Sequence, residues 1–325
     1  KILEILKNEE RRVSGEELAE RIQVSRTAVW KNIHALMEEG YDIQAVRNKG
    51  YRLTRPTGVI TEEGLKKQLK TKRIGRNIKV VDSLESTNDE MKGMAQEGED
   101  EGSVLIAREQ TKGKGRRGKS FVSPKGAGLY MSVLLRPKLS AERSVEMTIR
   151  AALAVSRAID RLTGRQSRIK WVNDVYLDGK KVAGILTEGS FEMETGNMEY
   201  VVLGIGINVS DSARLLPQDL RDKAGDLSAK GSVDLSQLAV ELLESLEQVI
   251  ENEDFSEIMR GYRERSLLPG KRVLVEKGSD RFEAEAKTID DKGRLIVVRK
   301  DGKEAVIDSG EVSILDWQGR VNGEE

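Results

Sequence analysis

The sequence predicts a multidomain α+β protein, because three stretches with different hydrophobic periodicity follow one another along its 325 residues. Helical spacing dominates the start of the chain, helices and strands mix in the long central part, and short strands between Gly-containing turns make up the end. A chain of this length also exceeds one typical domain. We therefore expect three domains, which span residues 1–58, 59–267 and 268–325.

The first domain has the pattern of a winged helix-turn-helix. An amphipathic helix over residues 16–22 is followed by the tight turn Gln23-Val24, and Ser25 then caps a further helix that ends before Gly40. Two β-like runs around the turn Asn48-Lys49-Gly50 predict a hairpin, the wing. The side chains expected to point inward from the helix that Ser25 caps are Ala28, Val29, Ile33, Leu36 and Met37.

A helix of this kind can enter the major groove of DNA, and the hairpin beside it can contact phosphates. Residues 43–55 contain four basic residues and no acidic one, which suits a wing that contacts phosphate. A protein-binding or purely structural winged helix is the alternative, and the local basic charge disfavours it. The residues expected to bind DNA are Ser25, Arg26, Thr27, Lys31, Arg47 and Lys49.

Residues 113–120 read GKGRRGKS and match G-x-x-x-x-G-K-[ST], the pattern of a phosphate-binding loop in nucleotide hydrolases. That pattern requires a strand before the loop and a helix after it, whose first amides face the phosphates. Residues 104–107 have strand character, but Pro124 and two glycines fall where the helix would run, and residues 129–135 are again strand-like. We conclude that this basic loop joins two strands and that its cations serve another purpose.

The composition excludes several kinds of chemistry. The chain has 55 basic and 55 acidic residues, so any nucleic-acid surface must be local. It has one histidine, His34, and no cysteine, which excludes a Cys/His zinc site, a Ser-His-Asp triad elsewhere in the chain and a disulfide scaffold. No apolar run has the length of a membrane span and no signal peptide is recognisable, so we expect a cytoplasmic protein without membrane contact.

The central part mixes two long helices with strands. Helical spacing predicts helices over residues 142–162 and 235–250. Residues 170–177 and 181–186 flank Asp178-Gly179, which is a strong hairpin signal. A buried strand is expected at residues 200–209.

The stretch 211–230 is polar and lacks periodicity, and we interpret it as a mobile loop. Beyond Pro269-Gly270 the pattern changes to short strands separated by regularly spaced turns. This pattern predicts a small antiparallel barrel. Its expected strands lie at residues 273–276, 282–289, 295–298 and 304–307.

Four motifs occur in order along the central part. They are Ser86-Thr87-Asn88, Gln110 followed by GKGRRG at 113–118, the run KWVNDVYLDGKKVAGIL at 170–186, and Gly204-Ile205-Gly206-Ile207-Asn208. With the order of the three domains, these motifs closely resemble the bifunctional biotin protein ligases that also repress the biotin operon. The resemblance spans nearly the whole chain. It implies an N-terminal winged helix-turn-helix, a central α/β ligase domain similar to class II aminoacyl-tRNA synthetases, and a small C-terminal SH3-like β-barrel.

The resemblance implies a ligase whose substrates are ATP and biotin, with Mg²⁺ expected beside ATP. Biotin's carboxylate attacks the α-phosphate of ATP to give biotinyl-5′-AMP and pyrophosphate. A lysine of a biotin carrier domain, such as that of acetyl-CoA carboxylase, then takes the biotin. The resemblance also implies a homodimer that binds operator DNA with biotinyl-AMP as co-repressor. A basic, glycine-rich loop suits this chemistry because it brings donors and positive charge to a polyanion.

The resemblance also assigns residues to the steps. Lys181 and Arg116 are expected to be catalytic, whereas Lys180 would point the other way on a strand. The biotin-binding set is Ser86, Thr87, Asn88, Gln110, Gly113, Lys114, Gly115, Arg116, Lys181 and Gly184. The nucleotide-binding set is Arg116, Arg117, Lys119, Phe121, Asn173, Asp174 and Asn208. Asp174 is expected to pair with Arg116, and metal ligands cannot be assigned from the sequence.

Some of these residues allow other interpretations. Thr87-x-x-Glu90 is a capping box, which explains Thr87 as a helix cap as well as a ligand. The basic loop taken alone also fits a solvated linker. Phe121 and Val172 stand where the family often has tryptophan and proline, and the stretch 211–230 has no aromatic residue. Phe121 alone is therefore expected to stack on adenine.

Two other functions fit parts of the pattern. A transcription factor could sense biotin or its adenylate without catalysis, but the intact Lys181 and the intact basic loop argue against it. A dedicated ligase could carry an N-terminal domain that no longer binds DNA. Arg26, Lys31 and the basic wing argue against that alternative.

Overall fold

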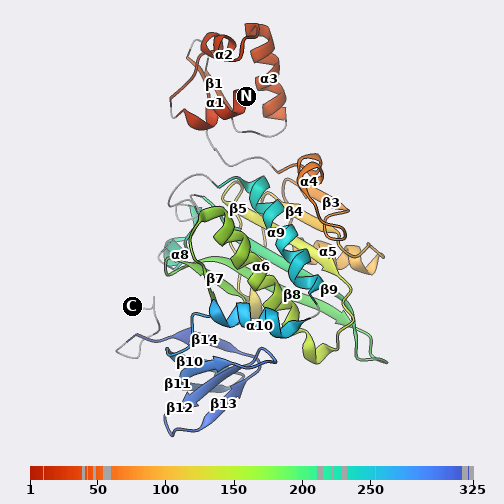
Figure 1. Cartoon of the computed structure of the whole chain (residues 1–325), viewed down its shortest axis with the longest axis vertical. Coiled ribbons are helices and arrows are strands. Elements are labelled where there is room, and N and C mark those ends of the chain that lie inside the picture. The colour runs from red at the N-terminus through yellow and green to blue at the C-terminus, as the bar shows by residue number, and fades with distance from the viewer. Residues whose placement is uncertain are drawn as a thin grey trace.

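The computed structural model arranges the chain as three units, which Figure 1 shows from the N-terminal helices through the central sheet to the C-terminal strands. The structure describes residues 1–9, 11–38, 41, 43–46, 49–53, 60–210, 215–221, 223–227, 233–252, 254–316 and 321. The predicted boundary between residues 58 and 59 lies outside these described residues.

The N-terminal unit is the predicted winged helix-turn-helix. Its elements are α1 (Ile2–Asn8), α2 (Gly15–Ile22), α3 (Arg26–Glu38) and the antiparallel pair β1 (Ile43–Val46) and β2 (Gly50–Leu53). Gln23, between α2 and α3, adopts a left-handed conformation with a φ of 56°, which lets the chain turn sharply there. The Ser25 hydroxyl accepts a hydrogen bond from the Ala28 N–H at 3.2 Å and so caps the start of α3. Leu18, Val29 and Ile33 are fully buried between the helices.

The prediction that Met37 points inward is wrong. Met37 is 37% exposed, because the core of this small unit closes around Ile33 and the partly buried Leu36. Trp30 is 52% exposed, and its ring lies 4.1 Å from the ring of His34 one helical turn later. The apolar face of α3 is therefore narrower than the sequence pattern indicates.

The central unit is built on a seven-stranded mixed sheet with strand order β3-β4-β5-β9-β8-β7-β6. β3 and β4 are parallel, and every other neighbouring pair is antiparallel. The strands are β3 (Ile78–Val81), β4 (Val104–Ala107), β5 (Gly128–Leu135), β6 (Arg168–Lys170), β7 (Asp174–Leu177), β8 (Lys180–Phe191) and β9 (Met198–Asn208). The helices are α4 (Glu62–Gln68), α5 (Thr87–Gln96), α6 (Val145–Thr163), α8 (Gln218–Arg221), α9 (Leu235–Glu251) and α10 (Phe255–Glu264).

The two faces of this sheet carry different helices. Val133 of β5 belongs to the core that includes α6 and α9, whereas its neighbour Leu134 packs with Met91 and Ala95 of α5. Successive side chains of a strand point to opposite faces, so α5 covers the face opposite to α6 and α9. Figure 1 shows α6 and α9 lying together across the sheet.

The basic loop joins β4 to β5, which are antiparallel neighbours, so the loop is not followed by a helix of the nucleotide-hydrolase type. This confirms the interpretation of GKGRRGKS. The loop contains one 3-10 turn, Arg116–Gly118, in which Arg117 has a φ of 57°.

The predicted strand at residues 170–177 is interrupted. Residues 171–173 form a turn between β6 and β7, because both ends of that turn bond to other elements. Trp171 Nε1 donates to the Gly293 carbonyl of the C-terminal unit at 2.9 Å, and Asn173 exchanges bonds with the backbone of Ile185 on β8. These long-range bonds replace the continuous ladder that the sequence pattern predicts.

The stretch interpreted as a mobile loop has regular structure in its described part. It contains α8, and Leu216 and Leu227 are buried. Lys181 and Ala224 form an isolated parallel bridge, so this segment lies beside the start of β8. Its contacts come from distant residues and leave no periodic signal in the sequence.

The sequence predicts a small antiparallel barrel for the C-terminal unit, and its described residues form a small antiparallel sheet with strand order β13-β12-β11-β10-β14. Its strands are β10 (Arg272–Lys277), β11 (Asp280–Ile289), β12 (Leu295–Arg299), β13 (Glu304–Ile307) and β14 (Glu311–Ile314). The last strand was not expected, although residues 311–314 read Glu-Val-Ser-Ile and alternate polar and apolar side chains. In the described part, β13 and β14 are the two edges and are not hydrogen-bonded neighbours.

Candidate active site

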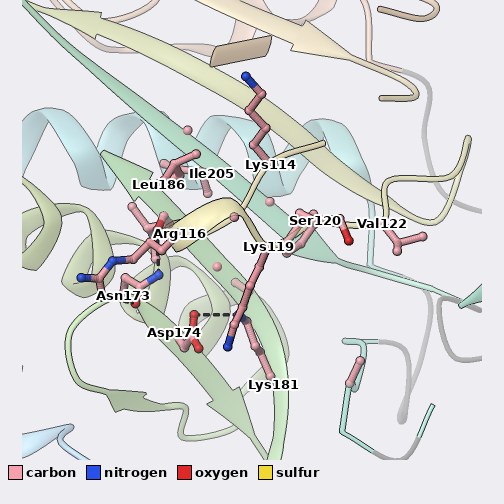
Figure 2. Close-up of a pocket in the computed structure, with 18 of the residues that line it drawn as sticks. Lys114, Arg116, Lys119, Ser120, Val122, Asn173, Asp174, Lys181, Leu186 and Ile205 are labelled. Atoms are coloured by element: carbon pink, nitrogen blue, oxygen red, sulfur yellow. Dashed lines mark hydrogen bonds and ion pairs between the residues drawn. The ribbon is translucent and has the colours of Figure 1, made fainter. Parts of the chain in front are cut away.

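A pocket of about 380 Å³ lies on the α5 face of the central sheet. The strand register shows which residues form its floor, because residues opposite each other on neighbouring strands point to the same face of the sheet. One row runs Ser132, Gly204, Leu186 across β5, β9 and β8. The next row runs Tyr130, Gly206, Gly184, Asp174, Lys170 and ends on β6. The basic loop lies over this floor, as Figure 2 shows.

The first row belongs to a neutral end of the pocket. The Thr87 hydroxyl donates to Gln110 Oε1 at 3.0 Å and accepts from Ser132 Oγ at 2.8 Å. Gln110 Oε1 also accepts from the Thr87 N–H at 2.8 Å, and Gln110 Nε2 donates to Ser123 Oγ at 2.9 Å. These neutral groups thus hold one another in fixed orientations.

Asn88 extends this network to β8. Its Oδ1 lies 2.7 Å from Ser132 Oγ, whose one proton is shared between Asn88 and Thr87, and its Nδ2 donates to Glu188 Oε2 at 2.8 Å. A Cβ placed on Gly204 would lie 2.2 Å from Asn88 Oδ1, so glycine is needed at that position for Asn88 to approach the sheet. This is a physical reason for the first glycine of the Gly204 to Asn208 motif.

The helix cap is one residue earlier than predicted. Ser86 is the N-cap of α5, and its hydroxyl accepts from the Asp89 N–H at 3.4 Å. Thr87 is therefore the first helical residue, and its hydroxyl is committed to Gln110 and Ser132. The capping-box interpretation of Thr87 is wrong, because the Ser86 side chain already satisfies the helix start.

The second row belongs to a charged end, where cations from the basic loop and from β8 meet carboxylates and an amide. Lys181 Nζ lies 2.7 Å from Asp174 Oδ1, an ion pair drawn in Figure 2. Arg116 Nη1 donates to Asn173 Oδ1 at 3.2 Å. The predicted Arg116–Asp174 pair is wrong, because the Asp174 side chain faces Lys181 while its neighbour Asn173 meets Arg116.

The other loop lysines reach outward in two directions. Lys114 Nζ lies 2.6 Å from Asp89 at the start of α5, and Lys119 forms an ion pair with Glu311 at the start of β14. Figure 2 shows Lys119 extending toward Asp174 and Lys181, whereas Lys114 extends away from them. The loop is thereby held between the central and C-terminal units.

Burial and charge perturb two groups of this end. Burial lowers the pKa of Arg116, an effect that Asp174 opposes, and an arginine remains charged in spite of such a shift. Burial would raise the pKa of Glu311, but Lys119, Lys170 and Arg117 outweigh it, so the pKa is lowered. Arg116 and Glu311 therefore both stay charged at neutral pH.

Phe121 lies on the glycines of the floor. A Cβ on Gly206 would come within 2.5 Å of the Phe121 ring, and one on Gly184 would lie 3.4 Å from both Phe121 Cε2 and Lys181 Nζ. The ring of Tyr130 meets Phe121 edge-on with centroids 6.4 Å apart. The two glycines thus make room for an aromatic ring and the lysine amine.

The structure brings nearly all of the predicted ligand-binding residues to this pocket. Those that line it are Ser86, Thr87, Asn88, Gln110, Lys114, Gly115, Arg116, Arg117, Lys119, Phe121, Asn173, Asp174, Lys181, Gly184 and Asn208. Gly113 does not line it but lets the Phe121 backbone approach, since a Cβ there would lie 2.2 Å from the Phe121 carbonyl oxygen. Lys180 is exposed and is not part of the lining.

Several pocket residues were missed by the sequence analysis. Ser132 is fully buried behind the lining residues Thr87 and Asn88, and it is the one serine in the otherwise apolar run of β5, which was a usable signal. Lys170 was noted only as the start of a motif. Leu216, Leu220 and the residues 310–312 come from other segments and had no local signal.

Of the predicted DNA-binding residues that the structure describes, Arg26, Thr27 and Lys31 lie on α3, and Ser25 immediately precedes it. All four of these residues are exposed, and Lys49 is exposed in the turn of the hairpin. Arg47 lies outside the described residues. Among the residues that the structure describes, no helix is long and apolar enough to cross a membrane.

Comparison with known proteins gives the class of the whole chain. The profile of the Biotin/lipoate A/B protein ligase family matches residues 80–208, an HTH domain matches residues 1–52, and the Biotin protein ligase C terminal domain matches residues 270–315. A biotin protein ligase from Aquifex aeolicus, solved in complex with biotin and ATP, aligns with a TM-score of 0.63 at 27% identity, over 74% of this chain and 98% of that one.

Individual relatives narrow the class. The bifunctional ligase/repressor BirA of Bacillus subtilis is 34% identical over 295 residues, which is 89% of this chain and 90% of the relative. The biotin–[acetyl-CoA-carboxylase] ligase of Mycobacterium tuberculosis is 33% identical over 247 residues, which is 73% and 88% of the two chains. The chain belongs to the biotin protein ligases. It is an ATP-dependent biotin ligase that carries the helix-turn-helix domain of the ligase/repressor type.

Proposed function

We propose that this pocket binds biotin and ATP together, forms biotinyl-5′-AMP, and passes biotin to a lysine of a carrier domain such as that of acetyl-CoA carboxylase. The observation that supports this most is the change of polarity along the floor, from neutral hydrogen-bonding groups to a dense group of cations. A substrate with a neutral head and an anionic tail, beside a polyphosphate, matches that change.

Biotin's ureido head is proposed to lie at the neutral end. Thr87, Asn88 and Gln110 offer donors and acceptors without net charge, which suits a neutral urea better than an ion. Ser86 and Gly115 complete the wall, and Gly113 and Gly184 give the space. The ring sulfur and the aliphatic tail then lie along the glycine floor, with the carboxylate toward Lys181.

Lys181 is proposed to bring the two reacting anions together. Its ammonium lies next to Gly184, in the middle of the second row, where the carboxylate would meet the α-phosphate. A fixed cation there offsets the charge that accumulates on the phosphate oxygens in the transition state. Asp174, 2.7 Å away, orients the amine.

Arg116, Arg117 and Lys119 are proposed to hold the nucleotide phosphates as the loop closes over them. The adenine is proposed to lie against Phe121 and the apolar side chains of Leu216 and Leu220, because a base needs apolar walls rather than charge. Asn173, Asp174 and Asn208 would then provide polar contacts. Lys114 is proposed to fasten the loop from its outer side.

Mg²⁺ is proposed to enter the pocket already bound to the phosphates of ATP. In the described part of the chain, no group of three His, Cys, Asp or Glu residues could hold a metal ion, and Asp174 and Glu311, the two carboxylates of the pocket lining, each pair with a lysine. Mg²⁺ commonly keeps its waters and binds through substrate phosphates with few protein ligands. The ion would add positive charge to that of the loop.

In the second half-reaction, the amine of the carrier lysine attacks the carbonyl carbon of biotinyl-AMP. The bond from that carbon to the phosphate oxygen breaks, AMP leaves with the electron pair, and the amine gives up a proton to solvent. Lys181 again offsets charge on the departing phosphate. One cation therefore serves both half-reactions.

The N-terminal domain is proposed to bind the operator of biotin genes as a homodimer, with biotinyl-AMP as co-repressor. One helix-turn-helix makes few contacts to bases, so each domain is proposed to bind one half-site of the operator. The residues proposed to contact that half-site are Ser25, Arg26, Thr27 and Lys31, with Arg47 and Lys49 of the wing. Among the described strands, β8 pairs beyond Ile185 only with β9, so beyond the Leu186 carbonyl, which accepts from Asn88, its other edge is open to a second copy. This open edge supports dimerisation through the central domain.

Two further proposals concern the chain as a whole. We propose boundaries at 58/59 and 267/268, supported by the match of the flanking family profiles to residues 1–52 and 270–315. We also propose a cytoplasmic location, since ATP, carrier proteins and DNA are available together there.

The ligase part is tested with purified protein, biotin, ATP and an apo carrier domain. We expect biotin-dependent pyrophosphate release and one biotin per carrier domain, and a sharp reduction of both rates in the Lys181→Ala variant. If the wild-type protein binds biotin and ATP but releases no pyrophosphate, the pocket acts as a sensor and the ligase proposal fails.

The repressor part is tested by sedimentation and operator binding with no ligand, with biotin, and with biotin plus ATP but no carrier. Biotinyl-AMP must favour the dimer through differential affinity, so the last condition should give the largest dimer fraction and the tightest operator binding. Equal results in all three conditions would leave a dedicated ligase with an uncoupled N-terminal domain.

A further inference from the structure

Lys170 is a lysine of the pocket lining to which no role has been given. It is the last residue of β6 and lies opposite Asp174 at the end of the second floor row. It is partly buried, whereas Lys223, another lysine of the lining, is exposed. The remaining question is what a semi-buried ammonium binds at this end of the pocket.

Apart from the exposed Lys223, every other cation of the pocket lining has a partner within the protein. Lys114, Lys119 and Lys181 have carboxylates, Arg116 has the Asn173 amide, and Arg117 reaches the Glu276 carbonyl at 3.5 Å. Within the described ranges, Lys170 has neither an ion pair within 4.0 Å nor a hydrogen bond of its ammonium to a protein group.

The electrostatic surroundings of Lys170 also indicate an ammonium that lacks a contacting counter-charge. Burial lowers its pKa, an effect that Asp174 and Glu311 oppose and that Lys181 and Lys119 reinforce. Both carboxylates therefore act on Lys170 from a distance while each contacts another lysine. Leaving a partly buried ammonium without a contacting counter-charge is costly, and such groups in a cleft are typical of ligand-binding sites.

The position of Lys170 indicates which part of the substrates it meets. Neighbouring strands lie about 4.8 Å apart, so Lys170 on β6 lies roughly 19 Å from Ser132 on β5, at the far end of the pocket from the neutral groups. Lys181 on β8 lies between them. The apolar wall of Leu216 and Leu220 suits adenine, which leaves the side with Lys119 and Lys170 for the remaining phosphates.

We propose that Lys170 binds the β- and γ-phosphates of ATP and then the pyrophosphate that leaves. This rests on the proposed function of the pocket. When the biotin carboxylate oxygen bonds to the α-phosphorus, the bond from that phosphorus to the α,β-bridging oxygen breaks and its electron pair stays on pyrophosphate. Lys170 stabilises the charge that accumulates there, so it acts in adenylate formation and not in transfer of biotin to the carrier.

The test separates the two half-reactions in Lys170→Met, Lys170→Arg and the control Lys180→Met, whose lysine is exposed and outside the lining. For Lys170→Met we expect kcat/KM for ATP to fall about 10- to 100-fold, the usual loss for a hydrogen bond to a charged group. ATP formation from preformed biotinyl-AMP and pyrophosphate should fall similarly, with a raised KM for pyrophosphate. Transfer from preformed biotinyl-AMP to the carrier should stay within about twofold of wild type.

Lys170→Arg keeps the charge and should retain most of the pyrophosphate-dependent activity, whereas Lys181→Ala should lower all three rates. Equal losses of transfer and adenylation in Lys170→Met, or no loss in either, would overturn the inference. If wild type and Lys180→Met form no biotinyl-AMP at all, the proposed function of the pocket fails instead.

A measurement on the wild-type protein covers the case in which Lys170→Met does not fold. Reductive methylation followed by mass spectrometry should modify Lys170, and pyrophosphate should protect it while biotin alone should not. Modification of Lys170 that is unaffected by saturating pyrophosphate would contradict the inference.

Discussion

The two ends of the pocket are held together by different interactions. At the neutral end, Thr87, Asn88, Gln110 and Ser132 satisfy one another through hydrogen bonds of 2.7 to 3.0 Å, and the side chains of Thr87, Asn88 and Ser132 are buried. At the charged end, Lys119 and Lys181 form ion pairs with the partly exposed carboxylates of Glu311 and Asp174. A neutral ligand thus meets a preformed site, whereas an anionic ligand meets cations whose present partners it can replace.

This difference predicts where substitutions act. Changes at the neutral end should affect biotin affinity and protein stability together, because buried donors or acceptors are left without partners. Changes at the charged end should affect catalysis and ligand retention with little effect on stability, because exposed ion pairs contribute little.

The largest effect is expected for Lys181→Ala. Loss of a fixed cation at the reacting phosphate should lower biotinyl-AMP synthesis by about 10²- to 10³-fold, the range seen when one transition-state donor is removed. The measurement is pyrophosphate release that depends on both ATP and biotin. Lys180→Ala is the control and should stay near wild type, and similar losses in both variants would remove Lys181 from this role.

Thr87→Val should have the next largest effect. It keeps the side-chain shape but leaves Gln110 Oε1 and Ser132 Oγ each without one bond, at a cost of about 1 to 3 kcal/mol in the free energy of unfolding. The Kd for biotin should rise about tenfold or more. Calorimetric titration and urea unfolding measure both quantities. The exposed Thr195→Val is the control, and unchanged biotin affinity in Thr87→Val would argue against a biotin head at this end.

Arg116→Gly should weaken retention of the adenylate. The variant loses one charge and the bond to Asn173, so biotinyl-AMP should dissociate about tenfold faster while its synthesis persists. Dissociation is measured by stopped-flow displacement, and escaped adenylate appears as biotin on lysines of a bystander protein. Wild-type dissociation with wild-type bystander labelling would mean that another part of the loop retains the intermediate.

The smallest effect is expected for Asp89→Asn, which breaks the ion pair to Lys114. Burial would raise the pKa of Asp89, but bonds from Lys114 and Lys92 outweigh it and the pKa is lowered. The stabilisation is therefore complete above the unfolded-state pKa of about 3.9 and is lost as pH falls through the lower folded value.

Unfolding of wild type and Asp89→Asn should differ by about 0.2 to 1 kcal/mol at neutral pH, the range for exposed pairs, and by less at high salt. The difference should vanish in acid. A difference that grows on acidification would show that the carboxylate of Asp89 is unfavourable in the folded protein.

Local patterns were enough to predict much of this molecule. The turn at Gln23-Val24, the failure of GKGRRGKS to precede a helix, and the alternation that separates Lys181 from Lys180 all depend on neighbours within a few residues. The resemblance to biotin protein ligases then predicted which residues bind biotin and the nucleotide. Most of these residues line one pocket, although they come from separate segments between residues 86 and 208.

What the sequence determined by itself was the type and order of the elements and the kinds of residue that the chemistry requires, because propensity and periodicity are short-range properties. The tertiary structure decided which of these residues touch. Asp174 meets Lys181 instead of Arg116, Ser132 completes the neutral end, and Glu311 reaches the loop from a different domain. Those contacts depend on strand register and domain packing between segments up to 192 residues apart, which no local pattern encodes.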